Sequence, residues 1–290
     1  RLLPFGMQPL RYLMVSAVLA LPVAAQSPVA ISNIRYDVRF DSATAASRTI
    51  GVAMRFTAAR AGLVQVSLPA WTPGAYELGN YARFVNRFNA TLGADSLDWD
   101  KADPDTWRIR VPRSGDVRVA FDYTADSLDN AMSWSRPDFA FFNGTNLFLY
   151  PEGQPMSFAS TVTVRTTAGW RVATGMRPGT AANTWVAADY HELVDMPFFI
   201  GRFDIDSTTI VGKTFRFASY PVGSVTGATR ANVFTQMGRV VPFQAMIFGE
   251  VPWDTYTLMQ VSDESFTFGA AAGLEHRNSH VDIVSPVVLG

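Results

Sequence analysis

A short-range alternation of apolar and polar residues constrains this chain more than any other feature of its sequence. From Ile34 to Phe40 every second residue is apolar, and the residues between them are charged. An alternation of period two indicates a strand with one buried face. Further strand-like stretches follow at residues 50–56, 63–68, 107–111, 117–123, 161–164 and 215–217. Many short strands separated by turn residues favour an antiparallel sandwich or a saddle-shaped sheet.

Turn-forming residues separate these predicted strands. The chain has 21 glycines and 17 prolines, and 13% of its residues are aromatic, a mixture that suits strands joined by tight turns. A Pro-Arg-Ser-Gly turn at residues 112–115 lies between two of the stretches, so we expect stretches 107–111 and 117–123 to form a hairpin. We predict a mostly β domain over residues 27–205.

The pattern changes after about residue 223. Residues 226–249 carry an apolar stripe at helical spacing, formed by Val233, Phe234, Met237, Val240 and Val241. Pro242 should either kink this helix or begin a second one. A strand follows at residues 256–261. A helix and a strand after a long all-β stretch predict a second domain over residues 206–290.

Composition and missing motifs exclude several classes of protein. The formal net charge of -1 argues against a nucleic-acid partner. The absence of cysteine excludes disulfides, thiolate metal sites and a cysteine nucleophile. There is no G-x-S-x-G elbow and no phosphate-binding P-loop. A glycoside hydrolase with two paired carboxylates stays an open class, because residues far apart in the sequence can form such a pair.

The first residues have the features of an export signal. Met7 is the expected start, Arg11 gives a positive region, and residues 12–21 form a short apolar run. Small residues at 22–25 supply a cleavage site, so we predict a signal peptide over residues 7–25. The run is too short to span a bilayer. We therefore expect an exported protein, periplasmic or extracellular, with no stable membrane anchor after cleavage.

Residues 68–76 (LPAWTPGAY) combine turn formers with aromatic residues. Pro73-Gly74 presets a turn. The favoured interpretation is a structural corner pinned by Trp71 and Tyr76. A carbohydrate-binding platform would use similar aromatic residues and stays as the alternative.

The histidines are few and do not complete a zinc motif. His276 and His280 are four residues apart, but Arg277 stands where the H-E-x-x-H motif needs glutamate. Asn278-Ser279 suits a turn better than the interior of a helix. His191 is followed by a glutamate but lacks the second histidine. We therefore predict no metal ligand among them.

The segment at residues 269–279 (GAAAGLEHRNS) combines small residues with one acid. Small residues let another backbone approach closely. The edge of such a strand could pair with a peptide and hold its free amine through Glu275. An ordinary edge strand with an exposed glutamate is the alternative that these residues alone favour.

Four segments in the same order resemble the glycyl aminopeptidases, which are PDZ-containing zinc metallopeptidases. Residues 273–279 are similar to that family's G-L-E-H-x-N-S signature, and residues 71–76, with Tyr81-Ala82-Arg83 beyond them, to its W-x-P-G-x-Y segment. Residues 193–197, with Gly201-Arg202-Phe203, resemble its L-x-D-x-P…G-x-F segment, and residues 251–256 resemble the stretch before the signature. The resemblance runs in order over residues 31–279.

The resemblance implies a β-rich N-terminal domain, then an α+β, thermolysin-like catalytic domain and a PDZ domain. It implies that Glu275 would bind the substrate's N-terminal ammonium. Gly273, Leu274 and His276 complete the substrate-binding residues that it implies, with backbone groups from Gly273 and Leu274. The family's catalytic glutamate and two zinc-binding histidines lie in an H-E-x-x-H motif, with a further glutamate downstream as the third zinc ligand, and residues 281–290 contain neither. Zinc is thus expected in the full-length protein, and no catalytic or metal-binding residue and no bound zinc in this chain.

The resulting hypothesis is the N-terminal fragment of an exported zinc aminopeptidase that removes N-terminal residues from peptides, with small residues such as glycine as a candidate preference. The fragment is expected to be truncated within its catalytic domain and inactive alone. The alternative is a non-catalytic exported β-sandwich that binds peptide or glycan.

Overall fold

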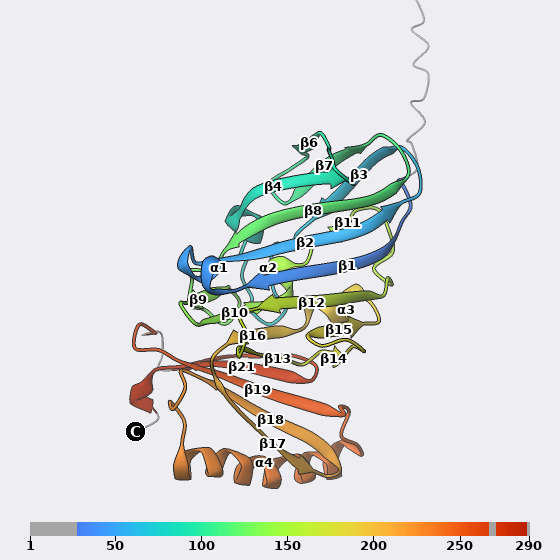
Figure 1. Ribbon diagram of the computed structural model, residues 1–290. Helices are drawn as coiled ribbons and strands as arrows, with labels where there is room; N and C mark the ends of the chain where they lie inside the picture. The colour runs from blue at the N-terminus through green and yellow to red at the C-terminus, as the bar shows by residue number, and fades with distance from the viewer. Residues whose placement is uncertain (1–27, 267–270, 289–290) are drawn as a thin grey trace, which may run out of the picture.

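A computed structural model describes residues 28–266 and 271–288, so the predicted signal peptide lies outside the described residues. The chain is mostly β, as predicted, and its sheets are stacked in layers with one long helix at the end of the stack (Figure 1). No helix in the described ranges is long and apolar enough to cross a membrane.

The largest sheet has eight strands in the order β14-β15-β12-β1-β2-β8-β4-β5. All neighbours are antiparallel except β1 and β12, which run parallel. Its strands are β1 (Ile31–Phe40), β2 (Thr49–Ala58), β4 (Val85–Leu92), β5 (Asp95–Ser96), β8 (Gly115–Thr124), β12 (Ser160–Thr166), β14 (Arg177–Pro178) and β15 (Thr184–Ala187). The alternation seen in the sequence places one face of these strands in a core and leaves the other in solvent.

Two four-stranded sheets, β11-β3-β7-β6 and β13-β16-β10-β9, accompany the large sheet. Their strands are β3 (Gly62–Ser67), β6 (Trp99–Lys101), β7 (Thr106–Val111), β11 (Tyr150–Pro151), β9 (Trp134–Arg136), β10 (Phe139–Asn143), β13 (Arg171–Thr174) and β16 (Pro197–Gly201). Buried side chains from all three sheets form one continuous core.

The hairpin predicted around residues 112–115 is wrong. β7 pairs with β3 and β6, whereas β8 pairs with β2 and β4 in the large sheet. The turn therefore carries the chain from one sheet to another, and both strands direct their apolar faces into the same core. Alternation identifies the buried face of a strand but not its hydrogen-bonded neighbour.

β10 and β16 lie between two cores and are buried at every position. Ala140 and Phe142 belong to the first core, whereas Phe139 and Phe141 belong to a second core shared with the next sheet. Continuous burial explains the unbroken apolar runs at these positions, which carry no alternation and gave no strand prediction.

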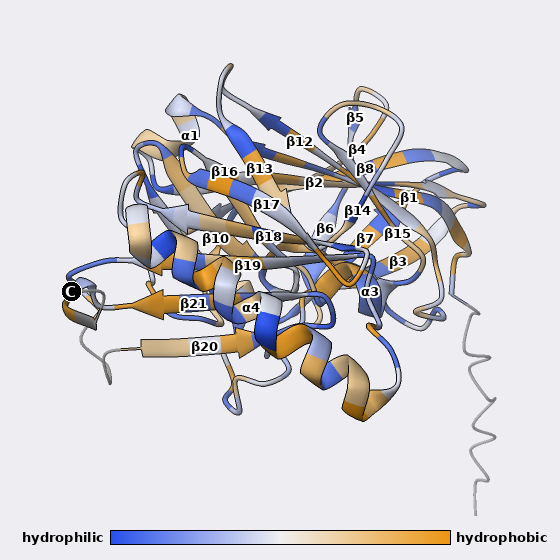
Figure 2. Cartoon of the chain, turned by 90° about the horizontal axis from the view of Figure 1, so that it is seen from below, coloured by the Kyte–Doolittle hydropathy of each residue, from blue (hydrophilic) through white to orange (hydrophobic). Residues whose placement is uncertain are grey.

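The last sheet has the order β17-β18-β19-β21-β20, with β18, β19 and β21 parallel and both edge strands antiparallel. Its strands are β17 (Asp204–Ile210), β18 (Lys213–Tyr220), β19 (Thr255–Ser262), β20 (Ala271–Glu275) and β21 (Ser279–Val284). One face packs on the second core and the other on helix α4 (Gly227–Phe248), which connects β18 to β19 (Figures 1 and 2).

Helix α4 follows the predicted stripe with two differences. Val233, Phe234, Met237 and Val241 contact the sheet, but Val240 is exposed. The helix also continues through Pro242 as one element, so no second helix begins there.

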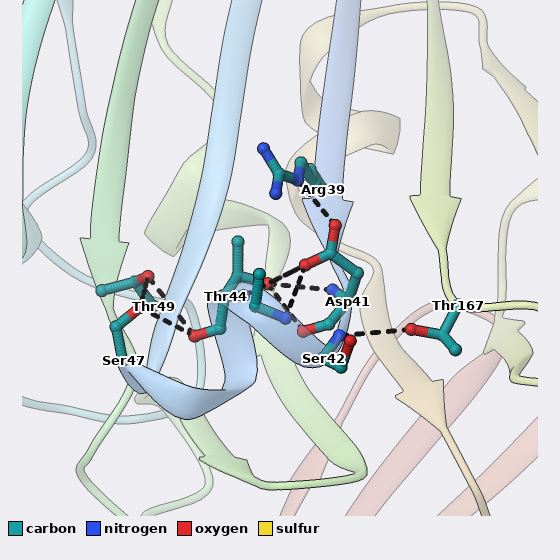
Figure 3. Close-up of polar contacts among 8 residues, drawn as sticks. Arg39, Asp41, Ser42, Thr44, Ser47, Thr49 and Thr167 are labelled. Carbon is teal, nitrogen blue, oxygen red and sulfur yellow. Dashed lines mark hydrogen bonds and ion pairs between the residues drawn. The ribbon is translucent and has the colours of Figure 1, made fainter.

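Short helices join the strands: α1 (Ser42–Ala46), α2 (Gly144–Leu147), α3 (Tyr190–Val194), and the 3-10 turns η1 (Tyr81–Phe84) and η2 (Pro286–Val288). α1 begins with a capping box, in which the Asp41 carboxylate accepts from the backbone of Ala43 and Thr44 while Thr44 Oγ1 accepts from the Asp41 backbone (Figure 3). The same carboxylate accepts from Arg39 Nε at 2.7 Å.

Candidate substrate-binding site

The predicted substrate segment forms β20, an edge strand with β21 on one side only. The backbone N–H of His276 donates to Ser279 O at 3.0 Å, which closes a two-residue turn at Arg277-Asn278. A turn rather than a helix therefore separates His276 from His280, as the sequence indicated.

The hydrogen-bond alternation of β20 determines which backbone groups face outward. His276 and Ser279 form a hydrogen-bonded pair, so Leu274 and Val281 form the next one. Glu275 and Gly273 lie in the intervening pairs and direct their backbone groups to the free edge. This differs from the expectation for Leu274, whose backbone groups are used inside the hairpin.

The free edge is partly covered by one side chain from the loop before β9. Asn130 Nδ2 donates to Gly273 O at 2.7 Å, and Asn143 Nδ2 holds Asn130 through its carbonyl at 2.8 Å. Sequence reasoning missed Asn130, and nothing in its neighbourhood of the sequence points to β20. Gly273 N–H and the backbone groups of Glu275 remain along this edge.

A side chain at Gly273 would require its cross-strand neighbours to shift. A Cβ there would lie 2.9 Å from His280 Nε2 and 3.0 Å from Asp282 Oδ1. These two side chains hydrogen-bond each other at 2.8 Å and share one face of the sheet with Glu275. The bond to Asp282 raises the pKa of His280, with burial opposing it and Glu275 adding to it.

Glu275 is exposed, whereas the next side chain is not. His276 Nδ1 hydrogen-bonds Asp195 Oδ1 at 3.2 Å, and the other oxygen of this carboxylate accepts from the Arg277 backbone at 2.9 Å. The His276 side chain is only 1% exposed. Asp195 caps the end of α3, so the L-x-D-x-P segment fixes the turn that follows Glu275.

The loop at residues 71–76 contacts β20 at Leu274, on the face of the strand opposite Glu275. Gly74 has a φ of +90°, and a Cβ there would lie 2.9 Å from the buried Leu274 side chain. The loop is anchored by Thr72, which hydrogen-bonds Tyr81 and Thr145 at 2.5 Å each. The predicted anchors are wrong, because Trp71 is 49% and Tyr76 96% exposed. The segments that carry Gly74, Asn130 and Asp195 thus meet around β20, and the Glu275 side chain is left in solvent.

This arrangement defines a scaffold that presents a strand edge and a carboxylate. The Peptidase M61 N-terminal domain family matches residues 35–202, more than half of the chain. The chain therefore belongs to the M61 peptidases, which confirms the resemblance found in its sequence. No curated protein matches it.

A solved structure with a TM-score above 0.5 shares the fold. The crystal structure of an aminopeptidase N family protein from Idiomarina loihiensis matches 89% of this chain with a TM-score of 0.77 and 22% identity. An M1 zinc metallopeptidase from Deinococcus radiodurans matches 88% of it, with a TM-score of 0.47 and 12% identity. This chain covers 43% of the first protein and 60% of the second.

Zinc does not fit the residues described. Over residues 28–266 and 271–288, no three His, Asp or Glu side chains are grouped so that they could hold a metal ion. His276 faces Asp195 at a buried contact, whereas His280 faces Asp282 on the α4 side of the sheet. No chemical step can be derived through a metal at these positions.

Proposed function

We propose that this chain is the N-terminal portion of an exported zinc aminopeptidase and that it supplies the recognition of the substrate's free N-terminus. Membership of a peptidase family and the shared fold support the hydrolase class. The sequence pattern of residues 7–25 supports export to the periplasm or beyond. The domain division at residues 205 and 206 belongs to the same proposal, in which the second domain begins the catalytic unit.

One observation carries the proposal: an exposed carboxylate at Glu275 beside the outward-facing backbone groups of an edge strand. A peptide can extend the sheet along Gly273 and Glu275, and its α-ammonium can pair with the Glu275 carboxylate. An internal peptide bond has no ammonium, so the carboxylate selects the chain end. The turn fixed by Asp195 positions Glu275 before the substrate arrives.

The first experiment measures peptide binding by the chain itself. Gly-Ala-Ala with a free amine should bind more tightly than its N-acetylated form, and Glu275→Gln should remove the difference. The ion pair is exposed, so we expect an effect of about threefold to tenfold in Kd. Glu264→Gln is the matched control, because Glu264 is also exposed but lies outside β20. Equal affinity for both peptides would contradict the proposal.

A second candidate is favoured by the exposure of Trp71 and Tyr76 beside β20. A non-catalytic module would bind peptide or glycan on these rings. Its binding would be lost in Tyr76→Ala and unchanged in Glu275→Gln. Such a result would replace the first proposal.

A further inference from the structure

The outer face of the eight-stranded sheet contains a hollow that the proposed function does not use. The inner face of this sheet lies on the core, and β12, β1, β2 and β8 lie side by side across the middle of the sheet (Figure 1). Small residues form a low floor, since Gly51 lies opposite Asp122, and Ala53 lies opposite Ala120. The hollow measures about 440 Å³.

Five arginines line this hollow: Arg39, Arg55, Arg87, Arg118 and Arg165. Two pairs of them lie directly opposite each other on neighbouring strands, Arg55 with Arg118 and Arg39 with Arg165. Like charges at directly opposed positions destabilise a sheet. The chain as a whole has a net charge of -1, so this concentration of positive charge is local.

Three aspartates neutralise part of this charge. Asp37 lies 2.8 Å from Arg55 and 3.8 Å from Arg165, Asp122 pairs with Arg87, and Asp41 pairs with Arg39 (Figure 3). Arg118 has no hydrogen bond or ion pair with any described residue. Desolvation, and then the nearby Arg55, lower the pKa of Arg118, and the nearby Asp37 offsets only part of this lowering.

We propose that this hollow binds a soluble molecule that carries two or more phosphate or sulfate groups. Guanidinium groups match the geometry of these oxyanions and form paired hydrogen bonds with them. Arg39 lies opposite Gly51, and Arg55 is four residues further along β2, so the two opposed arginine pairs are about 13 Å apart along the strands and one oxyanion can lie at each pair. The floor of small residues leaves room for the group that joins the two anions.

The proposal is tested by titrating tripolyphosphate into the chain at low salt and measuring the heat of binding. We expect saturable binding that weakens as salt is added, because the contacts are exposed to solvent. Arg55→Gln combined with Arg118→Gln should weaken binding at least about tenfold, since two charge-assisted contacts are lost. Arg171→Gln removes one charge from exposed Arg171 on β13, outside the hollow, and should change Kd less than about twofold.

The controls keep each outcome decisive. Circular dichroism checks the fold of every variant. Arg165→Gln, at a side chain that is 71% exposed, replaces the double variant if that protein does not fold, and should weaken binding by about threefold. No saturable binding, or equal losses in Arg55/Arg118 and Arg171 variants, would overturn the proposal. Binding to phosphatidic acid vesicles without binding to tripolyphosphate would overturn it in favour of a membrane surface.

Discussion

Residues around β20 have roles set by close contacts rather than by their chemical type alone. Gly273 leaves space for the His280–Asp282 pair, and His276 uses its ring to hold Asp195. Glu275 directly precedes His276 in sequence, yet its side chain is exposed whereas that of His276 is buried. The one carboxylate available to a ligand on β20 is therefore supported by side chains that are committed to the fold.

The His280–Asp282 pair predicts a pH-dependent contribution to stability. A raised folded-state pKa means that the stabilisation is complete below the ordinary imidazole pKa and is lost as pH rises through the folded value. His280→Gln should lower the free energy of unfolding by about 0.5–1 kcal/mol more at pH 6 than at pH 8.5. Urea unfolding of both proteins measures this, with His191→Gln, at an exposed residue of α3, as the control. A deficit that grows with pH would contradict the assignment.

The elements show two ways of using an apolar sequence. β10 and β16 are buried on both faces, whereas α4 buries one stripe and exposes Phe243, Met246, Ile247 and Phe248. Within α4, Pro242 removes the hydrogen bond to the carbonyl of Gly238, four residues earlier. Gly249, with a φ of +87°, then ends the helix in the left-handed region.

Replacing Pro242 should strengthen α4. Pro242→Ala restores a donor and removes the ring, so we expect the free energy of unfolding to rise by about 1–3 kcal/mol. Chemical denaturation measures the change. Arg239→Ala on the exposed side of the same helix should change it by less than about 0.5 kcal/mol. A loss of stability in Pro242→Ala would show that the proline is favourable where it stands.

At the scale of the whole molecule, the last sheet is joined to the sheet of β13, β16, β10 and β9 by a shared core and a few polar contacts. Phe139, Phe141 and Phe199 pack against Met259 and Val261 of the last sheet. Arg136 pairs with Asp263 at 3.0 Å, and Asn278 Nδ2 donates to Gly175 O at 2.7 Å. These contacts fix β20 relative to the loops that surround it.

The exposed apolar side of α4 predicts self-association of this chain. Phe243, Met246, Ile247 and Phe248 are 59–78% exposed and lie on the last turns of the helix, where Figure 2 shows hydrophobic segments. Phe243→Glu with Ile247→Glu should shift the sedimentation profile towards monomer. Leu78→Glu, at a residue 69% exposed in a loop, is the control and should leave association unchanged. A wild-type chain that stays monomeric at high concentration would contradict this prediction.

The sequence by itself determined the strand class, the buried faces of β1, β2 and β8, the apolar stripe of α4 and the segment that carries Glu275. These follow from local periodicity, which each stretch contains in full. It did not determine that β7 and β8 belong to different sheets, or that Phe139 and Phe142 face different cores. Nor did it place Asn130 on Gly273 or Asp195 on His276, because those partners are 143 and 81 residues apart. Only the tertiary structure decides such contacts, since a side chain's chemistry limits its possible partners but the packing of the sheets selects among them.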